Sequence, residues 1–276
     1  MKQLLRSLIH RLGFEPLHYS NDGLLQSLLK TYNELRLSAG KKQHYSLSLL
    51  RIASLYHLKQ SLQLNKIDLL IDVGANLGQF ALDARRTGYT GEIISFEPIA
   101  ANQEYLNNLA LADKDNNWKI IPYALGSETS ELQLNVYKDD SFSSLHSVNF
   151  LAQSSFGKMV ELDHVETVKI HTIDEVAESL GINPSRRIFL KTDTQGHDAE
   201  VIKGGQQTLN YVLGILTEAT VKPLYDECVT LEDLSKLLAS MGFVYGGMFP
   251  ISYIPGTLEL IELDCYFTRK SEIVGS

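Results

Sequence analysis

The sequence contains only two cysteines in 276 residues, Cys228 and Cys265, which lie far apart and have no CxxC spacing. So few cysteines indicate neither a zinc site nor a disulfide framework. Because free cysteine is among the most buried residue types, we expect two reduced thiols packed inside the fold.

Clusters of lysine and arginine are absent as well, and the formal net charge is −8. Binding to nucleic acid needs a basic face that can contact phosphates. The composition therefore excludes a generic nucleic-acid binder and favours a small molecule or a sugar (glycan) acceptor as the partner.

Long apolar runs are missing too. No run approaches the length of a transmembrane helix, and the N-terminus has no apolar core followed by a small-residue cleavage site. We therefore expect a cytoplasmic protein. Residues 1–12 predict an amphipathic helix that caps the domain or a twin subunit of a homo-oligomer. Weak contact with a membrane surface is the alternative, less favoured because this helix is short and only mildly basic.

The length of the chain suits one α/β domain with an appendage. Residues 1–66 lack the pattern of strands and predict an N-terminal helical cap, with helical stretches at 24–37 and 45–64. Residues 67–270 carry strand and helix patterns that predict one Rossmann-like domain. Residues 271–276 predict a frayed tail.

Residues 67–80, IDLLIDVGANLGQF, pass from a continuous apolar run into a glycine-bearing turn and then a helix. The run suits a central strand of a parallel sheet that is covered on both faces. Asp72 lies near its carboxyl end, where Gly74 and Gly78 let the backbone turn tightly. The segment predicts a ligand-binding crevice at the carboxyl edge of the sheet.

Further strand and helix patterns follow. Strands are predicted at 92–96, 118–123, 165–173, 212–217 and 258–267, helices at 100–112, 174–180 and 231–241, and another strand, turn and helix at 187–205. Residues 124–127 (Ala124, Leu125, Gly126 and Ser127) predict a turn, and the last two strands predict an antiparallel pair at the sheet edge.

The turn after the first strand can be compared with the dinucleotide fingerprint GxGxxG. Aligned on Gly74, its second and third glycine positions hold Asn76 and Gln79. The second glycine lets the backbone approach a pyrophosphate, so its absence counts against an NAD-dependent oxidoreductase. The pattern suits a nucleoside ligand, and Glu97, at the end of the next strand, can accept both ribose hydroxyls.

Three segments together resemble one known family: IDVGANLGQF at 71–80, FEP at 96–98 and LKTDTQGHDAEVIKGG at 190–205. They are similar to the FkbM-type S-adenosylmethionine-dependent methyltransferases over about residues 68–267. The resemblance implies a Rossmann-like class I methyltransferase fold, a seven-stranded mixed sheet with helices on both faces, here with an N-terminal helical extension. It also implies S-adenosyl-L-methionine as the cofactor and O-methylation of a hydroxyl on a sugar, glycolipid or secondary-metabolite acceptor.

The resemblance also implies cofactor contacts position by position. Asp72, Gly74 and Asn76 would surround the methionine moiety. Glu97 would bind the ribose, and the turn at 124–125 would flank the adenine. The complete set implied is Asp72, Gly74, Ala75, Asn76, Gly78, Phe80, Glu97, Pro98, Ala124, Leu125 and Asp193.

Two positions depart from the family pattern. Gln195 stands where the family usually has glutamate, and His197 where it often has a small residue. These departures keep a non-catalytic, cofactor-binding protein as the alternative function, with the oxidoreductase as a less favoured one.

Asp193, His197 and Glu218 are the candidates for catalysis. Each can act as the base for an alcohol acceptor, whose neutral oxygen is a poor nucleophile. The other interpretation of Asp193 is a cap for the following helix or a support for the cofactor. Together with Asp198, Asp193 and Glu218 could instead hold Mg²⁺. Spacing alone does not establish a metal site, so we expect no metal ion.

The polar stretch 139–155 predicts an active-site loop. Its substrate-binding candidates are Ser143, Ser144 and His146. They are chosen by analogy with related folds, in which insertions between strands line the site.

Overall fold

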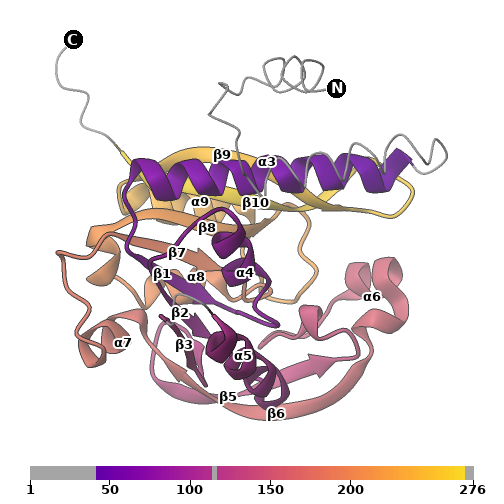
Figure 1. Cartoon of the computed structure of the whole chain (residues 1–276). Helices are drawn as coiled ribbons and strands as arrows, with labels where there is room; N and C mark the ends of the chain where they lie inside the picture. Colours follow the sequence, from indigo (N-terminus) through magenta and orange to yellow (C-terminus); the bar gives the residue numbers. More distant parts are fainter. Residues whose placement is uncertain (1–41, 114–116, 271–276) are drawn as a thin grey trace, which may run out of the picture.

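The computed structural model describes residues 42–113 and 117–270. The predicted helix at 1–12, the helical stretch at 24–37 and the tail at 271–276 lie outside these residues. Within the described part, seven strands form one sheet in the order β3-β2-β1-β7-β8-β10-β9 (Figure 1). The strands are β1 (Leu69–Val73), β2 (Glu92–Phe96), β3 (Trp118–Ile121), β7 (Ile188–Thr192), β8 (Val212–Thr220), β9 (Phe243–Tyr253) and β10 (Leu260–Arg269).

β1 and β7 are neighbouring parallel strands in the middle of this sheet. Every residue of both is buried, which explains their nearly continuous apolar sequences. The register places Asp72 of β1 beside Lys191 of β7. β10 runs antiparallel to both β8 and β9. The predicted seven-stranded mixed sheet with an antiparallel edge is therefore confirmed.

Helices cover both faces of the sheet (Figure 1). On one face α3, α4 and α5 enclose a core that includes Leu58 and Leu106. On the other face α7, α8 and α9 enclose a core that includes Ile202 and Leu238. The helices are α3 (Lys42–Leu64), α4 (Gln79–Arg86), α5 (Ala100–Ala112), α7 (Ile173–Ser179), α8 (Asp198–Lys203) and α9 (Leu231–Ser240), and a short 3-10 helix, η3 (Thr208–Tyr211), precedes β8.

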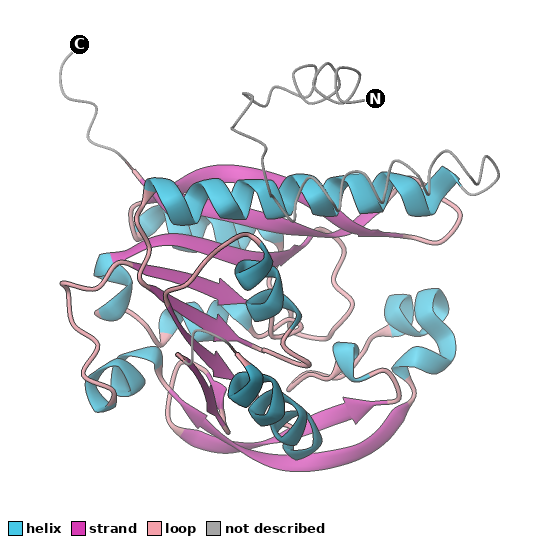
Figure 2. Cartoon of the chain, in the orientation of Figure 1, coloured by secondary structure: helices cyan, strands magenta, loops and turns pink. Residues whose placement is uncertain are grey.

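A second, three-stranded sheet lies at the end of the domain away from α3 (Figure 2). Its order is β4-β6-β5, with β4 (Ala124–Leu125), β5 (Ser130–Tyr137) and β6 (Leu162–His171). The turn predicted at 124–127 was wrong for Ala124 and Leu125, because this dipeptide forms β4 and pairs with β6, a partner distant in the sequence. The strand predicted at 165–173 is β6, and it belongs to this second sheet.

The stretch between β5 and β6 contains three short helices. They are η1 (Asp140–Phe142), α6 (Phe150–Phe156) and η2 (Gly157–Val160). A bridge between Val148 and Tyr225 ties the stretch to the loop after β8. The predicted active-site loop is therefore partly helical and fixed to the main domain.

α3 packs on β9 along the antiparallel edge of the main sheet (Figure 1). Ser54 Oγ donates to Asp264 Oδ2 at 3.1 Å, and Tyr266 Oη donates to the backbone oxygen of Ser54 at 3.0 Å. These bonds, one buried and one partly buried, join the helix to β10. Across residues 42–113 and 117–270, no helix is long and apolar enough to cross a membrane.

Both cysteines are free thiols. Cys265 is buried in β10, as predicted, whereas Cys228 is only partly buried in the loop after β8. Burial raises the pKa of the Cys228 thiol to about 11, so the thiol stays protonated at neutral pH.

Candidate functional site

A cavity of about 700 Å³ opens at the carboxyl ends of β1, β2 and β7. Residues of α3 and β9 line one side of it, and residues between β5 and β6 line another. The predicted site residues on its surface are Gly74, Ala75, Asn76, Phe80, Glu97, Pro98, Ala124, Leu125, Ser143, Asp193, His197 and Glu218. Candidates for cofactor binding and for catalysis therefore share one cavity.

Four predicted site residues, Asp72, Gly78, Ser144 and His146, are not among those that line the cavity. A Cβ atom at Gly78 would lie 2.9 Å from Cδ2 of Leu106, so this glycine lets the turn pack on α5. The other three contact residues of the cavity wall and are described with them below.

Glu97 is buried directly after β2. Its Oε2 accepts a hydrogen bond from the backbone N–H of Asn76 at 2.8 Å, and its Oε1 accepts one from Ile99 at 2.9 Å. Burial raises the pKa of this carboxyl to about 7, although the two N–H groups oppose the shift. Each oxygen keeps a lone pair for a further donor. The carboxyl group is thus held in place and can accept two further hydrogen bonds.

The turn after β1 contains three residues with positive φ, Gly74 at 74°, Asn76 at 47° and Gly78 at 79°. A Cβ atom at Gly74 would lie 2.0 Å from the backbone oxygen of Asp193, so glycine is needed where the β1 and β7 turns meet. Asn76 Oδ1 is buried and has no hydrogen-bond partner among the described residues. A donor group of a ligand in the cavity would satisfy it.

Lys191, which the sequence analysis did not single out, is a buried cation in the cavity wall. Its Nζ lies 3.2 Å from Asp72 Oδ1 and 3.7 Å from Asp193 Oδ2, and it donates to the backbone oxygen of Gly74 at 2.7 Å. Burial works against the charge, but Asp72 and Asp193 raise the pKa of Lys191 above its ordinary value. A lysine that directly follows the apolar run Ile188, Phe189 and Leu190 in a central strand is the signal that could have identified it.

Glu218 of β8 and Glu262 of β10 are neighbouring acidic residues in the same wall. Burial, and then the neighbouring Glu262, raise the pKa of Glu218 well above its usual value. Burial likewise raises the pKa of Glu262. The pair therefore retains a proton at a higher pH than isolated glutamates do.

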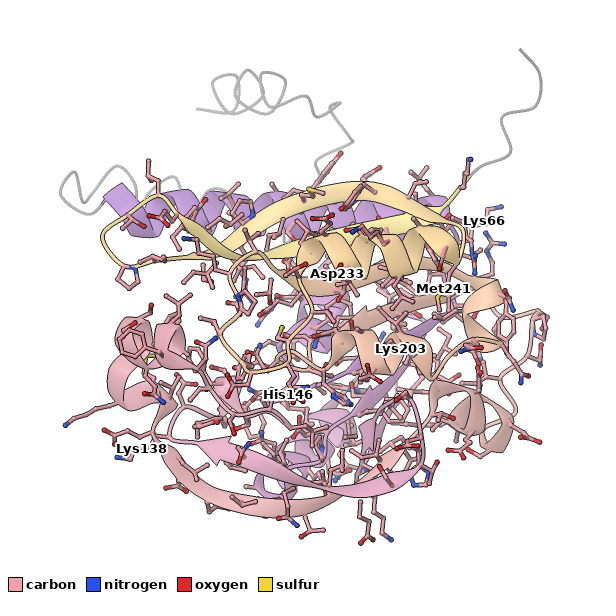
Figure 3. The ribbon with its side chains drawn as sticks, turned by 180° about the vertical axis from the view of Figure 1, so that it is seen from behind. Lys66, Lys138, His146, Lys203, Asp233 and Met241 are labelled. Atoms are coloured by element: carbon pink, nitrogen blue, oxygen red, sulfur yellow. The ribbon has the colours of Figure 1, made fainter. Side chains whose placement is uncertain are left out.

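His197 precedes α8, and its Nδ1 lies 3.3 Å from Nε2 of His146. Burial, together with His146, lowers the pKa of His197 to about 4, and burial lowers the pKa of His146. The pair is therefore uncharged at neutral pH. In Figure 3 the label of His146 lies near the middle of the molecule, whereas that of Lys138 lies at its edge.

The two serine candidates differ in what they contact. Ser144 is buried, and its Oγ donates to the backbone oxygen of Gln195 at 2.6 Å. Ser143 lines the cavity, and its Oγ accepts a hydrogen bond from the backbone N–H of Tyr137 at 3.4 Å. Ser144 therefore fixes the turn after β7, and Ser143 lies on the surface of the cavity.

Apolar side chains from distant parts of the chain complete the cavity. Leu55 of α3 and Phe249 of β9 line it, as do Phe142 and Phe156, whose ring centroids are 4.9 Å apart. Phe142 lies in the stretch at 139–155 that the sequence predicts as an active-site loop. Sequence reasoning missed Leu55, Phe156 and Phe249, because only the long-range packing of α3, α6 and β9 brings them together.

Within residues 42–113 and 117–270, no group of three or more histidine, cysteine, aspartate or glutamate side chains could hold a metal ion. The alternative in which Asp193, Asp198 and Glu218 bind Mg²⁺ therefore finds no support in their arrangement.

Several solved structures are similar to this chain. A methyltransferase FkbM from Methylobacillus flagellatus is 13% identical over 96% of this chain and 70% of its own, with a TM-score of 0.46. Magnesium protoporphyrin IX methyltransferase from Synechocystis, with bound SAM, is 10% identical over 92% of this chain and 100% of its own, with a TM-score of 0.44. None of the curated proteins matches the chain.

The family comparison covers the turns after β1, β2 and β7 that line the cavity, whereas α3, β10 and the cavity-lining residues of β9 lie outside it. The model of the methyltransferase FkbM domain matches residues 72–245, from Asp72 in β1 to Tyr245 in β9. This is more than half of the chain, and it includes the turns after β1 and β7. The chain therefore belongs to the FkbM methyltransferase domain family.

Proposed function

We propose that this chain transfers a methyl group from S-adenosyl-L-methionine to a hydroxyl oxygen of a small-molecule or glycan acceptor. The observation that carries the proposal is the single cavity that both sets of candidates line. Asn76 and Glu97 lie beside the ends of β1 and β2, and Asp193 and Glu218 beside β7 and β8.

The residues present fit the cofactor. The buried Oδ1 of Asn76 has no partner within the described residues, so it suits a ligand N–H group such as the amino group of a methionine moiety. The two oxygens of Glu97 suit the two hydroxyls of a ribose. A volume of about 700 Å³ lies within the usual range for ligand sites and leaves room for an acceptor beside the cofactor.

When bound, S-adenosylmethionine would supply a methyl group activated by its positively charged sulfur. The residues of the chain would then have to align the acceptor hydroxyl and take its proton. Alignment contributes about 7–11 kcal/mol to lowering the barrier, and a positioned base contributes about 10²–10⁴-fold in rate.

Asp193 is the best placed of the three candidates to receive that proton. Its side chain is 37% exposed and lines the cavity beside Lys191. Glu218 is a weaker candidate because burial and Glu262 keep it protonated to higher pH. His197, with a pKa of about 4, can accept a hydrogen bond at pH 7 but holds a proton weakly.

The remaining lining supports an acceptor with both an apolar face and hydroxyl groups. Phe142, Phe156 and Phe249 offer aromatic surface, and Ser252 donates to Glu262 Oε2 at 2.8 Å in the same wall. A sugar ring presents both kinds of surface, which agrees with a glycan acceptor.

Asp193→Asn is expected to lower kcat by about 10²-fold or more, because the amide cannot take the hydroxyl proton. The measurement is formation of methylated product by mass spectrometry with a panel of hydroxyl-bearing acceptors. Asp163→Asn, an exposed change on β6, is the control and should leave kcat unchanged. Unchanged kcat in Asp193→Asn, or a product methylated on nitrogen or carbon, would contradict the proposal. Lost affinity for S-adenosylhomocysteine with unchanged kcat would assign Asp193 to the cofactor instead.

A further inference from the structure

Gln195 connects the two carboxylates of the proposed acceptor site. Its Nε2 donates to Asp193 Oδ1 at 2.9 Å and to Glu218 Oε1 at 3.3 Å. These carboxylates belong to neighbouring parallel strands, one just after β7 and the other within β8. One neutral amide group therefore supplies a hydrogen to each of them.

The orientation of this amide is fixed by Tyr225, which is buried. Tyr225 Oη lies 2.7 Å from Gln195 Oε1 and 3.0 Å from the backbone oxygen of Phe142, and its hydroxyl can donate to either. A flipped amide would place its oxygen against both carboxylates, which are acceptors as well. Only the observed orientation satisfies Asp193, Glu218 and Tyr225 together.

The backbone of Gln195 is held as firmly as its side chain. It has a φ of 51°, and its carbonyl oxygen accepts the 2.6 Å hydrogen bond from Ser144. The position is therefore set from both sides of the cavity, by the turn after β7 and by the stretch between β5 and β6.

The groups around the bridge that the Gln195 amide forms between Asp193 and Glu218 are mostly acidic. Those that face Asp193 and Glu218 are Lys191 of β7, Asp198 of α8, Tyr225 of the loop after β8, and Glu262 and Asp264 of β10. The positive charge of Lys191 is shared with Asp72. A neutral donor between two carboxylates thus relieves a repulsion that the neighbouring groups increase.

We propose that Gln195 is a positioning residue, whose amide bridges Asp193 and Glu218 and keeps both carboxylates in the cavity wall without a shared proton. Its role in catalysis rests on the proposed function, whereas the bridge itself is a property of the folded chain. Gln195→Glu tests it, because the change is nearly isosteric but replaces two N–H donors with an acceptor.

The introduced carboxyl group would lie against two others and would take up a proton on folding. Its pKa, and those of its neighbours, would be higher in the folded than in the unfolded state, so folding would bind protons. The stability of Gln195→Glu relative to the parent protein should therefore fall as the pH rises from about 5 to about 8.

The experiment compares urea unfolding midpoints of the full chain at several pH values across this range, for the parent, Gln195→Glu and the exposed control Gln206→Glu. A midpoint difference that widens with pH in Gln195→Glu alone supports the bridge. A difference that does not change with pH, or one that the control reproduces, overturns it. This readout needs no methyl transfer, so a widening difference in a protein that binds no cofactor would reject the proposed function and keep the bridge.

If Gln195→Glu does not fold, Tyr225→Phe tests the positioning role of Gln195 instead. Loss of the hydroxyl frees the amide to turn away from Asp193, so kcat should fall roughly tenfold while affinity for S-adenosylhomocysteine is retained. Unchanged kcat overturns the positioning role. A loss of cofactor affinity with unchanged kcat overturns it too.

Discussion

Gly74→Ala is expected to destabilise the protein by more than about 4 kcal/mol, or to prevent folding altogether. The added Cβ would lie 2.0 Å from the backbone oxygen of Asp193, and neither backbone segment can move freely. Gly74 accepts a hydrogen bond from Lys191, and its N–H donates to the backbone oxygen of Phe96. The positive φ of 74° adds strain for any residue with a Cβ.

Gly88→Ala is the matched control. Its φ is 93°, but a Cβ there would have no described atom within 4 Å. Gly88→Ala should lower the free energy of unfolding by only about 1–2 kcal/mol, which is the strain of the left-handed backbone alone. Urea unfolding of both variants measures the difference. Similar losses in Gly74→Ala and Gly88→Ala would show that the close approach of the two turns is not what requires glycine.

Lys191→Met is expected to cost about 3–5 kcal/mol, because it leaves the fully buried carboxylate of Asp72 without its ion-pair partner. Asp72 Oδ2 accepts a hydrogen bond from Ser95 at 2.9 Å, but Oδ1 has Lys191 as its charged neighbour at 3.2 Å. Methionine has a similar length and fills the space, so lost packing contributes little.

Lys119→Met tests whether the loss of stability in Lys191→Met depends on burial of the ion pair. Lys119 forms an exposed ion pair with Glu92 at 2.7 Å, which should be worth less than about 1 kcal/mol. The double variant Asp72→Asn with Lys191→Met should recover most of the stability lost in Lys191→Met. Equal losses from the two lysine changes, or no recovery in the double variant, would argue against a buried pair that links β1 and β7.

The parts of this fold that the sequence predicts well are those specified locally. β1 with its turn and α4, and β7 with its turn and α8, each combine a buried strand, a polar turn and a helix within about twenty residues. The register between β1 and β7 then brings the two turns together, so Asn76 and Asp193 line one cavity.

The parts that sequence reasoning missed depend on long-range pairing. Ala124 and Leu125 resemble a turn until β6, more than thirty residues later, pairs with them. Phe249 and Glu262 reach the cavity only because β10 inserts between β8 and β9. Gln195 was recognised as a departure from the family pattern, but its bridge requires Glu218 from another strand and Tyr225 from a loop. No local pattern records such contacts.

The most direct test of the account is calorimetric titration of the full chain with S-adenosylmethionine, S-adenosylhomocysteine and NAD⁺. Both sulfur nucleosides should bind, NAD⁺ should not, and Glu97→Ala should weaken their binding roughly tenfold or more, a loss above about 1.4 kcal/mol. The exposed change Glu104→Ala on α5 should leave their affinity unchanged. Failure of both sulfur nucleosides to bind would contradict the methyltransferase account, and binding of NAD⁺ in their place would favour an oxidoreductase.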